Sequence, residues 1–203
     1  MRARWARLAA VGFTVEMGLA SVGVLVSTLG LFGVAPLLAA AGSVIVVALG
    51  LLVASWFRRF AVKARTRASG MAEVGAITTE YLAGGPGVVL GILAAAGIVP
   101  TTLCAVAVLL FGVMLMFGGT EVSRQANLST MYPPPHPPDP RTLRVLLLVA
   151  GVQMIVGIAA VILGIMALVG IRPVPLVLLA LLGMSVSKAL GAATVAWRMR
   201  MAT

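Results

Sequence analysis

Four polar side chains lie inside long apolar stretches of this sequence, and they are the residues best suited to chemistry. They are Glu16, Glu80, Gln153 and Lys188. A charged group within a membrane-spanning segment costs about 2.5–3.5 kcal/mol on insertion scales, so it faces protein or water and finds partners. Two carboxylates and one ammonium leave one formal negative charge in excess, which allows one carboxyl group to hold a proton. These four residues, called here the polar layer, therefore have three possible roles. They form a proton or cation site, they form an internal network that joins helices, or their side chains snorkel to the membrane interface.

Glu16, Glu80 and Gln153 share one spacing. Each lies 20 residues before a proline, and that proline stands three residues after a glycine. The pairs are Gly33 and Pro36, Gly97 and Pro100, and Gly170 and Pro173. Glycine ends one helix and proline suits the first turn of the next, so each pair predicts a tight turn between two helices. Lys188 lies 15 residues after its proline, which places it at about the same depth, roughly 20–24 Å from the turns at 1.5 Å per residue. Hydroxyl groups also lie near this level, on Thr14, Thr78, Thr79, Ser185 and Ser187.

The elements that carry these residues are predicted to cross a membrane. Of the 203 residues, 61% are hydrophobic and 10% are charged. A typical soluble domain has about 45–50% apolar residues and about 25% charged residues. This composition excludes a soluble enzyme, a disordered chain and an ordinary nucleic-acid-binding domain. Six apolar stretches are long enough to span a bilayer: Leu8–Leu31, Leu37–Phe57, Met71–Gly97, Thr101–Gly119, Leu143–Val169 and Val174–Trp197.

We therefore expect an all-α integral membrane protein with six transmembrane helices in three tandem parallel helical hairpins. The expected unit is a single membrane domain over residues 1–203, with hairpins at about 8–57, 71–119 and 143–197. A basic connection at 58–70 and a proline-rich cytoplasmic connection at 120–142 separate them. The first apolar stretch is too long for a signal peptide and contains a glutamate, so we expect it to be retained.

The net charge of +10 follows a topological pattern. All Lys and Arg residues except Arg172 and Lys188 lie at the termini or at the two longer connections. The positive-inside rule then places both termini in the cytoplasm of a multi-pass protein in a bacterial-type inner membrane. The basic face predicts contact with the lipid bilayer, including anionic lipids, and no binding of nucleic acid.

Two further glycine-rich motifs lie in the predicted spans. The segment Gly84-Gly85-Pro86-Gly87 predicts a helix break, since proline removes a helix hydrogen bond. Such a break either lines an ion or substrate site or is a kink in which glycines allow close packing. The stripe of Gly183, Ser187 and Gly191 predicts helix packing within the monomer or between monomers, which makes a homo-oligomer plausible.

The remaining sequence offers no catalytic machinery. Residues 133–140 form a proline-rich spacer around His136, and one histidine does not make a metal site. The single cysteine, Cys104, lies in an apolar stretch, where it acts as a small hydrophobic residue. We expect no enzyme activity, no cofactor and no metal.

The glycine and proline pattern resembles that of a known family. The stretch Tyr81-Leu-Ala-Gly-Gly-Pro-Gly-Val-Val-Leu-Gly-Ile-Leu, with Gly97-Ile-Val-Pro100 and Phe111-Gly112, resembles the HdeD-like small six-helix acid-resistance membrane proteins. The resemblance covers the architecture of the whole chain and implies a link to acid stress, although the membrane glutamates are not part of the family pattern.

Two functions stay open at this point. The first is a non-enzymatic inner-membrane protein in acid or ion homeostasis that moves protons or cations past Glu16 and Glu80. The second is a structural or scaffolding protein that oligomerises and recruits partners or lipids. It would do so through its basic cytoplasmic face and its proline-rich connection.

Overall fold

The computed structural model describes residues 2–64, 70–131 and 140–201, with side chains for most of 11–56, 81–117 and 144–193. The described chain is entirely helical apart from three short turns, which confirms the all-α prediction. The helices are α1 (Arg2–Leu31), α2 (Pro36–Ala64), α3 (Gly70–Ala95), α4 (Pro100–Met131), α5 (Pro140–Leu168) and α6 (Pro173–Met201). All except α3 contain an apolar stretch long enough to cross a membrane, and the described part of α3 contributes a shorter one, Tyr81–Ala95. The chain is therefore a helical membrane protein.

Several helices extend beyond the apolar stretches from which they are predicted. Helix α1 already begins at Arg2, while α2 continues to Ala64 and α4 to Met131. Parts of 58–70 and 120–142, predicted as connections, are therefore helical. Hydropathy marks where an apolar core ends, but helical hydrogen bonds continue into water when the residues are good helix formers such as Ala, Arg, Lys and Gln.

The three glycine–proline connections adopt the same backbone conformation. In the first, the Gly33 N–H donates to the Gly30 carbonyl at 3.1 Å, and the Val34 N–H donates to the Leu29 carbonyl at 3.0 Å. This pair of bonds is the Schellman motif. It requires a left-handed backbone conformation at one residue, which glycine adopts easily. The same bonds recur after α3 and α5, where Gly97 and Gly170 have φ values of 84° and 92°.

The residue before each turn proline also has a positive φ, although none of the three is glycine. The values are 42° at Ala35 and 40° at both Val99 and Arg172. A left-handed conformation costs an L-residue about 1–2 kcal/mol. Each proline then begins the next helix, at Pro36, Pro100 and Pro173. The three connections therefore share their hydrogen bonds, their strained position and their helix start.

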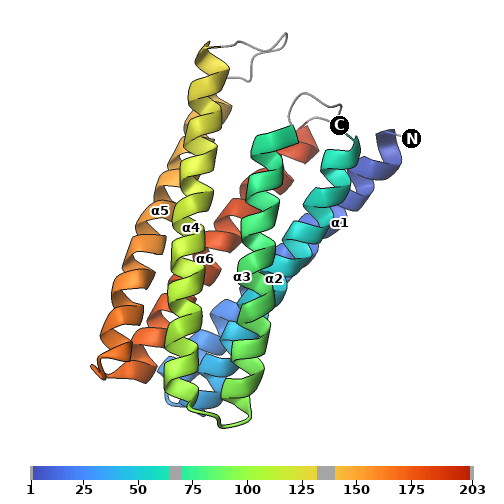
Figure 1. Ribbon diagram of the computed structural model, residues 1–203. Helices are drawn as coiled ribbons and strands as arrows, with labels where there is room; N and C mark the ends of the chain where they lie inside the picture. The colour runs from blue at the N-terminus through green and yellow to red at the C-terminus, as the bar shows by residue number, and fades with distance from the viewer. Residues whose placement is uncertain (1, 65–69, 132–139, 202–203) are drawn as a thin grey trace.

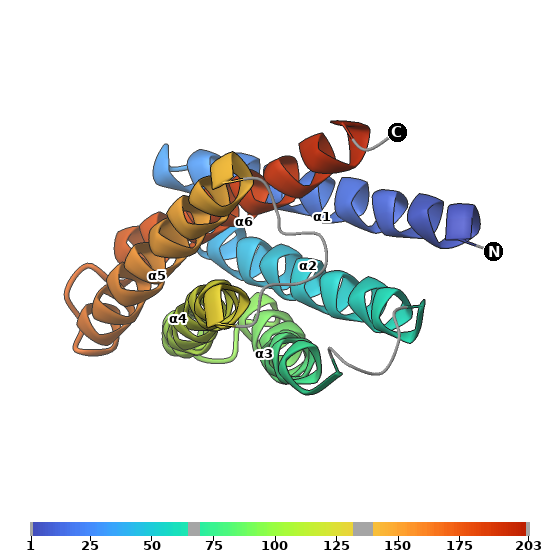
Figure 2. The same ribbon diagram turned by 90° about the horizontal axis from the view of Figure 1, so that it is seen from above.

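The six helices contact one another in a closed order (Figures 1 and 2). Each turn joins two helices that pack together, namely α1 with α2, α3 with α4, and α5 with α6. Between these pairs, α2 contacts α3, α4 contacts α5, and α6 contacts α1. Helices α2, α4 and α6 also contact one another, so they form the inside of the bundle. Figure 1 shows the three turns at one end and both chain termini at the other.

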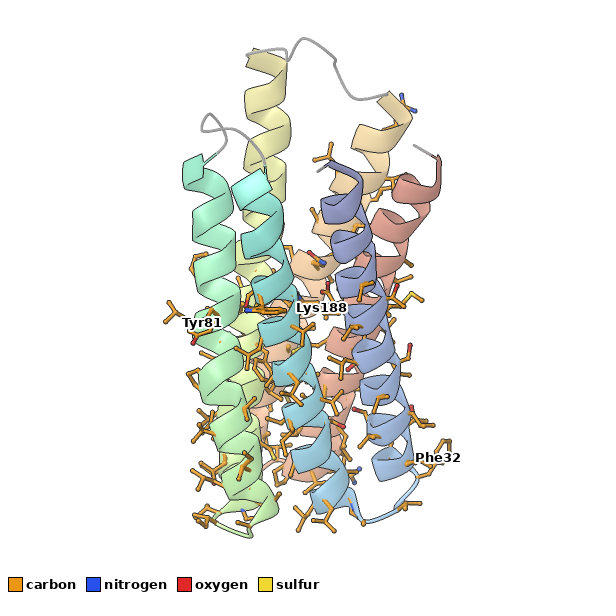
Figure 3. The ribbon with its side chains drawn as sticks, turned by 90° about the vertical axis from the view of Figure 1, so that its right-hand side faces the viewer. Phe32, Tyr81 and Lys188 are labelled. Carbon is orange, nitrogen blue, oxygen red and sulfur yellow. The ribbon has the colours of Figure 1, made fainter. Side chains whose placement is uncertain are left out.

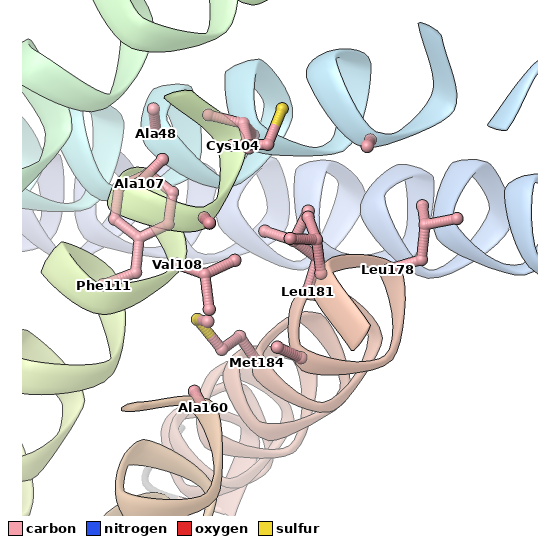
Figure 4. Close-up of a cluster of buried hydrophobic side chains, with 14 of the residues drawn as sticks. Ala48, Cys104, Ala107, Val108, Phe111, Ala160, Leu178, Leu181 and Met184 are labelled. Carbon is pink, nitrogen blue, oxygen red and sulfur yellow. The ribbon is translucent and has the colours of Figure 1, made fainter. Parts of the chain in front are cut away.

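The buried core is built mainly from these three inner helices (Figure 4). Its largest fully buried side chains include Phe111 of α4 and Leu178, Leu181 and Met184 of α6. Cys104 lies in the same cluster with 2% of its surface exposed, as a small hydrophobic residue.

The outer helices α1, α3 and α5 turn small residues toward this core. Their buried positions follow the same spacing in each helix: Ala20, Gly23, Ser27 and Gly30; Gly84, Gly87, Gly91 and Ala94; Gly157, Ala160, Gly164 and Ala167. Small residues allow backbones to approach closely, which is how helices associate where lipid removes the hydrophobic driving force. A Cβ atom added at Gly157 would lie 2.7 Å from the carbonyl oxygen of Gly112 in α4.

Candidate functional site

Glu16 and Lys188 line one small cavity where α1, α2 and α6 meet. The cavity has a volume of about 20 Å³. Its lining residues are Glu16, Ala20, Val46, Val47, Gly50, Leu51, Ser185 and Lys188. Only 6% of the Glu16 surface is exposed. Figure 3 shows Lys188 about midway along the bundle. The structure thus brings together one carboxyl group from the first helix and one ammonium group from the last.

The face of α1 that carries Glu16 is the face that packs against its neighbours. Glu16 lies one helical turn before Ala20, which begins the row of small buried residues in α1. Residues four apart lie on the same side of a helix. The glutamate therefore continues the packing row, and its burial follows from the contacts that α1 makes with α2 and α6.

Lys188 occupies a position that is part of the apolar core in the other two inner helices. It lies 15 residues after the proline that begins its helix. The residues at the same distance in α2 and α4 are Leu51 and Leu115, which are 2% and 4% exposed. A core position that receives an ammonium group requires a partner of opposite charge nearby, and Glu16 is the acidic residue on the shared cavity.

Gln153 of α5 lies beside α6. Its side-chain nitrogen is 3.1 Å from where a Cβ atom at Gly191 would stand, and Gly191 follows Lys188 by one helical turn. A Cβ atom at Gly183 would likewise meet Val156 of α5 at 3.8 Å. The stripe of small residues in α6 therefore packs against α5 within the same chain.

Glu80 lies in α3, and its side chain falls outside the described residues. Its neighbour Tyr81 lies at a similar height to Lys188 in Figure 3. However, the described part of α3 contacts α2 and α4, and α2 lies between α3 and α1 (Figure 2). Of the four predicted polar residues, Glu16 and Lys188 share a cavity, Gln153 adjoins α6 from α5, and Glu80 belongs to a helix across α2.

The segment Gly84-Gly85-Pro86-Gly87 does not interrupt its helix. Helix α3 runs continuously through Pro86, so the prediction of a helix break is wrong. A Cβ atom at Gly84 would lie 2.8 Å from Leu52, and one at Gly87 would lie 2.4 Å from the Phe111 ring. These glycines instead allow α3 to pack closely against α2 and α4, which is the packing interpretation of the motif.

Two serines of α6 add polar groups that the four-residue layer does not include. Ser185 and Ser187 are 1% and 2% exposed, and neither hydroxyl has a hydrogen-bond partner in the described structure. The Ser185 oxygen points toward α1, 2.6 Å from where a Cβ atom at Gly23 would stand. The sequence already places Ser185 near the depth of the polar residues, and alignment on the turn prolines shows that Ala48 and Gly112 take its place in α2 and α4.

A larger groove lies between α2 and α3. It has a volume of about 410 Å³ and is lined by Leu52, Val53, Ser55, Trp56, Tyr81 and Gly85. Trp56 and Tyr81 are 58% and 52% exposed. Aromatic side chains with a polar edge are typical of the membrane interface.

The described residues contain no group of three His, Cys, Asp or Glu side chains placed to hold a metal ion.

Comparisons with protein-family models, curated proteins and solved structures find no match for this chain. The resemblance to the HdeD-like family therefore rests on the glycine and proline motifs alone.

Proposed function

We propose that this protein takes up and releases protons at the Glu16–Lys188 cavity, as a non-enzymatic membrane protein of acid or ion homeostasis. The observation that carries the proposal is the nearly complete burial of Glu16 on a cavity that Lys188 also lines. Ionisable groups within membrane helices are costly and commonly mark proton or ion pathways.

The membrane arrangement belongs to the same proposal. All six helices cross a bacterial-type inner membrane as three tandem hairpins, with both termini in the cytoplasm. The common turn geometry and the position of all three turns at one end support this arrangement. The basic residues near the termini and the longer connections support the orientation.

The size and charge of the cavity favour protons over larger cations. A volume of about 20 Å³ fits about one water molecule, since a water requires roughly 10–15 Å³ measured in this way. A hydrated metal cation needs more room, and the ammonium group of Lys188 already supplies the positive charge that the Glu16 carboxylate would attract.

Proton flux into proteoliposomes tests the proposal directly. We expect the wild-type protein to carry protons along an imposed pH gradient, and the variant Glu16→Gln to lose at least about tenfold, because an amide keeps the shape but holds no exchangeable acid proton. Ser187→Ala is the matched control, since it alters a buried polar group of α6 outside the cavity lining. Equal flux in the wild type and Glu16→Gln would refute the proposal, as would wild-type flux no greater than that of empty vesicles.

A scaffolding role is the second candidate, and the contact between α1 and α6 favours it. This contact joins the first and last helices of the bundle, and the charged residues lie beside it. In that role the charges hold the bundle closed, while the basic cytoplasmic face and residues 133–140 recruit anionic lipids or partners. A protein without proton flux that captures a partner only when residues 133–140 are intact would support scaffolding.

A further inference from the structure

Three polar side chains from two helices converge on the small cavity. Glu16 comes from α1, and Ser185 and Lys188 come from α6. The remaining lining residues are Ala, Val, Gly and Leu, which offer no side-chain hydrogen bond. Any molecule held here would therefore meet a carboxyl group, a hydroxyl group and an ammonium group.

The Ser185 hydroxyl requires a partner that the described side chains do not provide. It is 1% exposed and has no hydrogen bond in the described structure. A buried hydroxyl without a partner loses its hydration without compensation. Because Ser185 lines the cavity, a molecule inside it can supply the missing hydrogen bond.

The dimensions of the cavity select the occupant. Its volume of about 20 Å³ exceeds the roughly 10–15 Å³ that one water occupies, and a buried water needs two to four polar partners. The cavity offers three. Lys188 makes a metal cation unfavourable at the same place, and Glu16 makes an anion unfavourable.

We infer that this cavity is a binding site for one ordered water molecule that bridges Glu16, Ser185 and Lys188. The water donates a hydrogen bond to a Glu16 carboxylate oxygen and accepts one from the Lys188 ammonium group. Its third hydrogen bond is with the Ser185 hydroxyl, which thereby gains a partner. This inference rests on the proposed function and deepens it. It names the water molecule that connects the buried Glu16 carboxyl group to the Ser185 hydroxyl by hydrogen bonds.

The site is specific to the contact between α6 and α1. At the places corresponding to Ser185 and Lys188, α2 has Ala48 and Leu51, and α4 has Gly112 and Leu115. These apolar residues cannot hold a water molecule. Ser187, the other buried serine without a described partner, does not line the cavity.

Infrared difference spectroscopy of the full-length protein in lipid bilayers, triggered by a pH change, tests the inference. We expect an O–H stretching band that shifts when H₂¹⁸O replaces H₂¹⁶O. Ser185→Ala should abolish or displace this band, whereas the matched control Ser187→Ala should retain it. Ala48 at the corresponding place of α2 shows that alanine fits such a position, so Ser185→Ala should fold.

The outcomes separate the water site from proton transport. An isotope-sensitive band that depends on Ser185, without proton flux, would support the water site and refute the proposed function. Flux without any isotope-sensitive band would refute the water site and leave the proposed function standing. A band that persists unchanged in Ser185→Ala would also overturn the inference, because it would come from water elsewhere.

Discussion

Lys188 is a charged residue at a place where the fold otherwise uses leucine. The corresponding residues Leu51 and Leu115 are buried among the inner helices, whereas Lys188 is partly exposed, so its charged side chain bears only part of the desolvation cost of burial. Glu16 lies one helix away on the same cavity. The energetic role of each residue should therefore depend on the presence of the other.

We predict that Lys188→Leu alone destabilises the protein by about 3 kcal/mol, because it leaves the buried Glu16 carboxyl without its nearby cation. Combining it with Glu16→Leu should recover most of this loss, since replacing both members of a charge pair by well-packed apolar residues is often nearly neutral in stability. Unfolding of the purified protein in mixed micelles, titrated with a denaturing detergent, measures both. If the effects of the two single substitutions simply add in the double variant, the residues do not interact.

Helix-to-helix contacts depend on where the small residues lie along each outer helix. In α5, the row that begins at Gly157 faces α4, while Gly151 is exposed and would meet nothing within 4 Å if it carried a Cβ atom. Gly157 and Gly151 therefore differ in whether they pack against another helix, although both lie within the regular backbone of α5. This difference makes them a matched pair for testing the close approach of α5 to α4.

We predict that Gly157→Leu destabilises the protein, whereas Gly151→Leu is neutral or stabilising. Both substitutions improve helix propensity by about 0.8–1 kcal/mol. At Gly157 the new side chain would begin 2.7 Å from the Gly112 carbonyl oxygen, and overpacking of this kind costs about 1–3 kcal/mol or more. The same detergent titration compares the two. Similar stabilities for both variants would mean that α4 and α5 are not as close as the structure places them.

At the scale of the whole molecule, the sequence predicts the helices and their turns better than their arrangement. Hydropathy finds each apolar helix, and Gly33 with Pro36 marks a turn because their backbone requirements are local. The contact between α6 and α1 links distant segments, and no local signal specifies it. The spacing from the prolines likewise predicts depth but not direction around the bundle. Glu16 and Glu80 therefore share a level in the sequence, although they belong to helices on either side of α2.

The proposed six-span topology has a consequence of its own, because it would place all three turns outside the cell. Val34, Ile98 and Ile171 each lie two residues before a turn proline and are 57%, 52% and 49% exposed. In a Cys104→Ala background, which removes the only cysteine, a cysteine at any of these positions should react with a membrane-impermeant maleimide in intact cells. A cysteine that replaces His136 should react only after permeabilisation, as the positive-inside rule requires. Unequal labelling would contradict the topology: if α3 did not cross the membrane, the turn at Ile98 would lie on the opposite side from the turn at Val34.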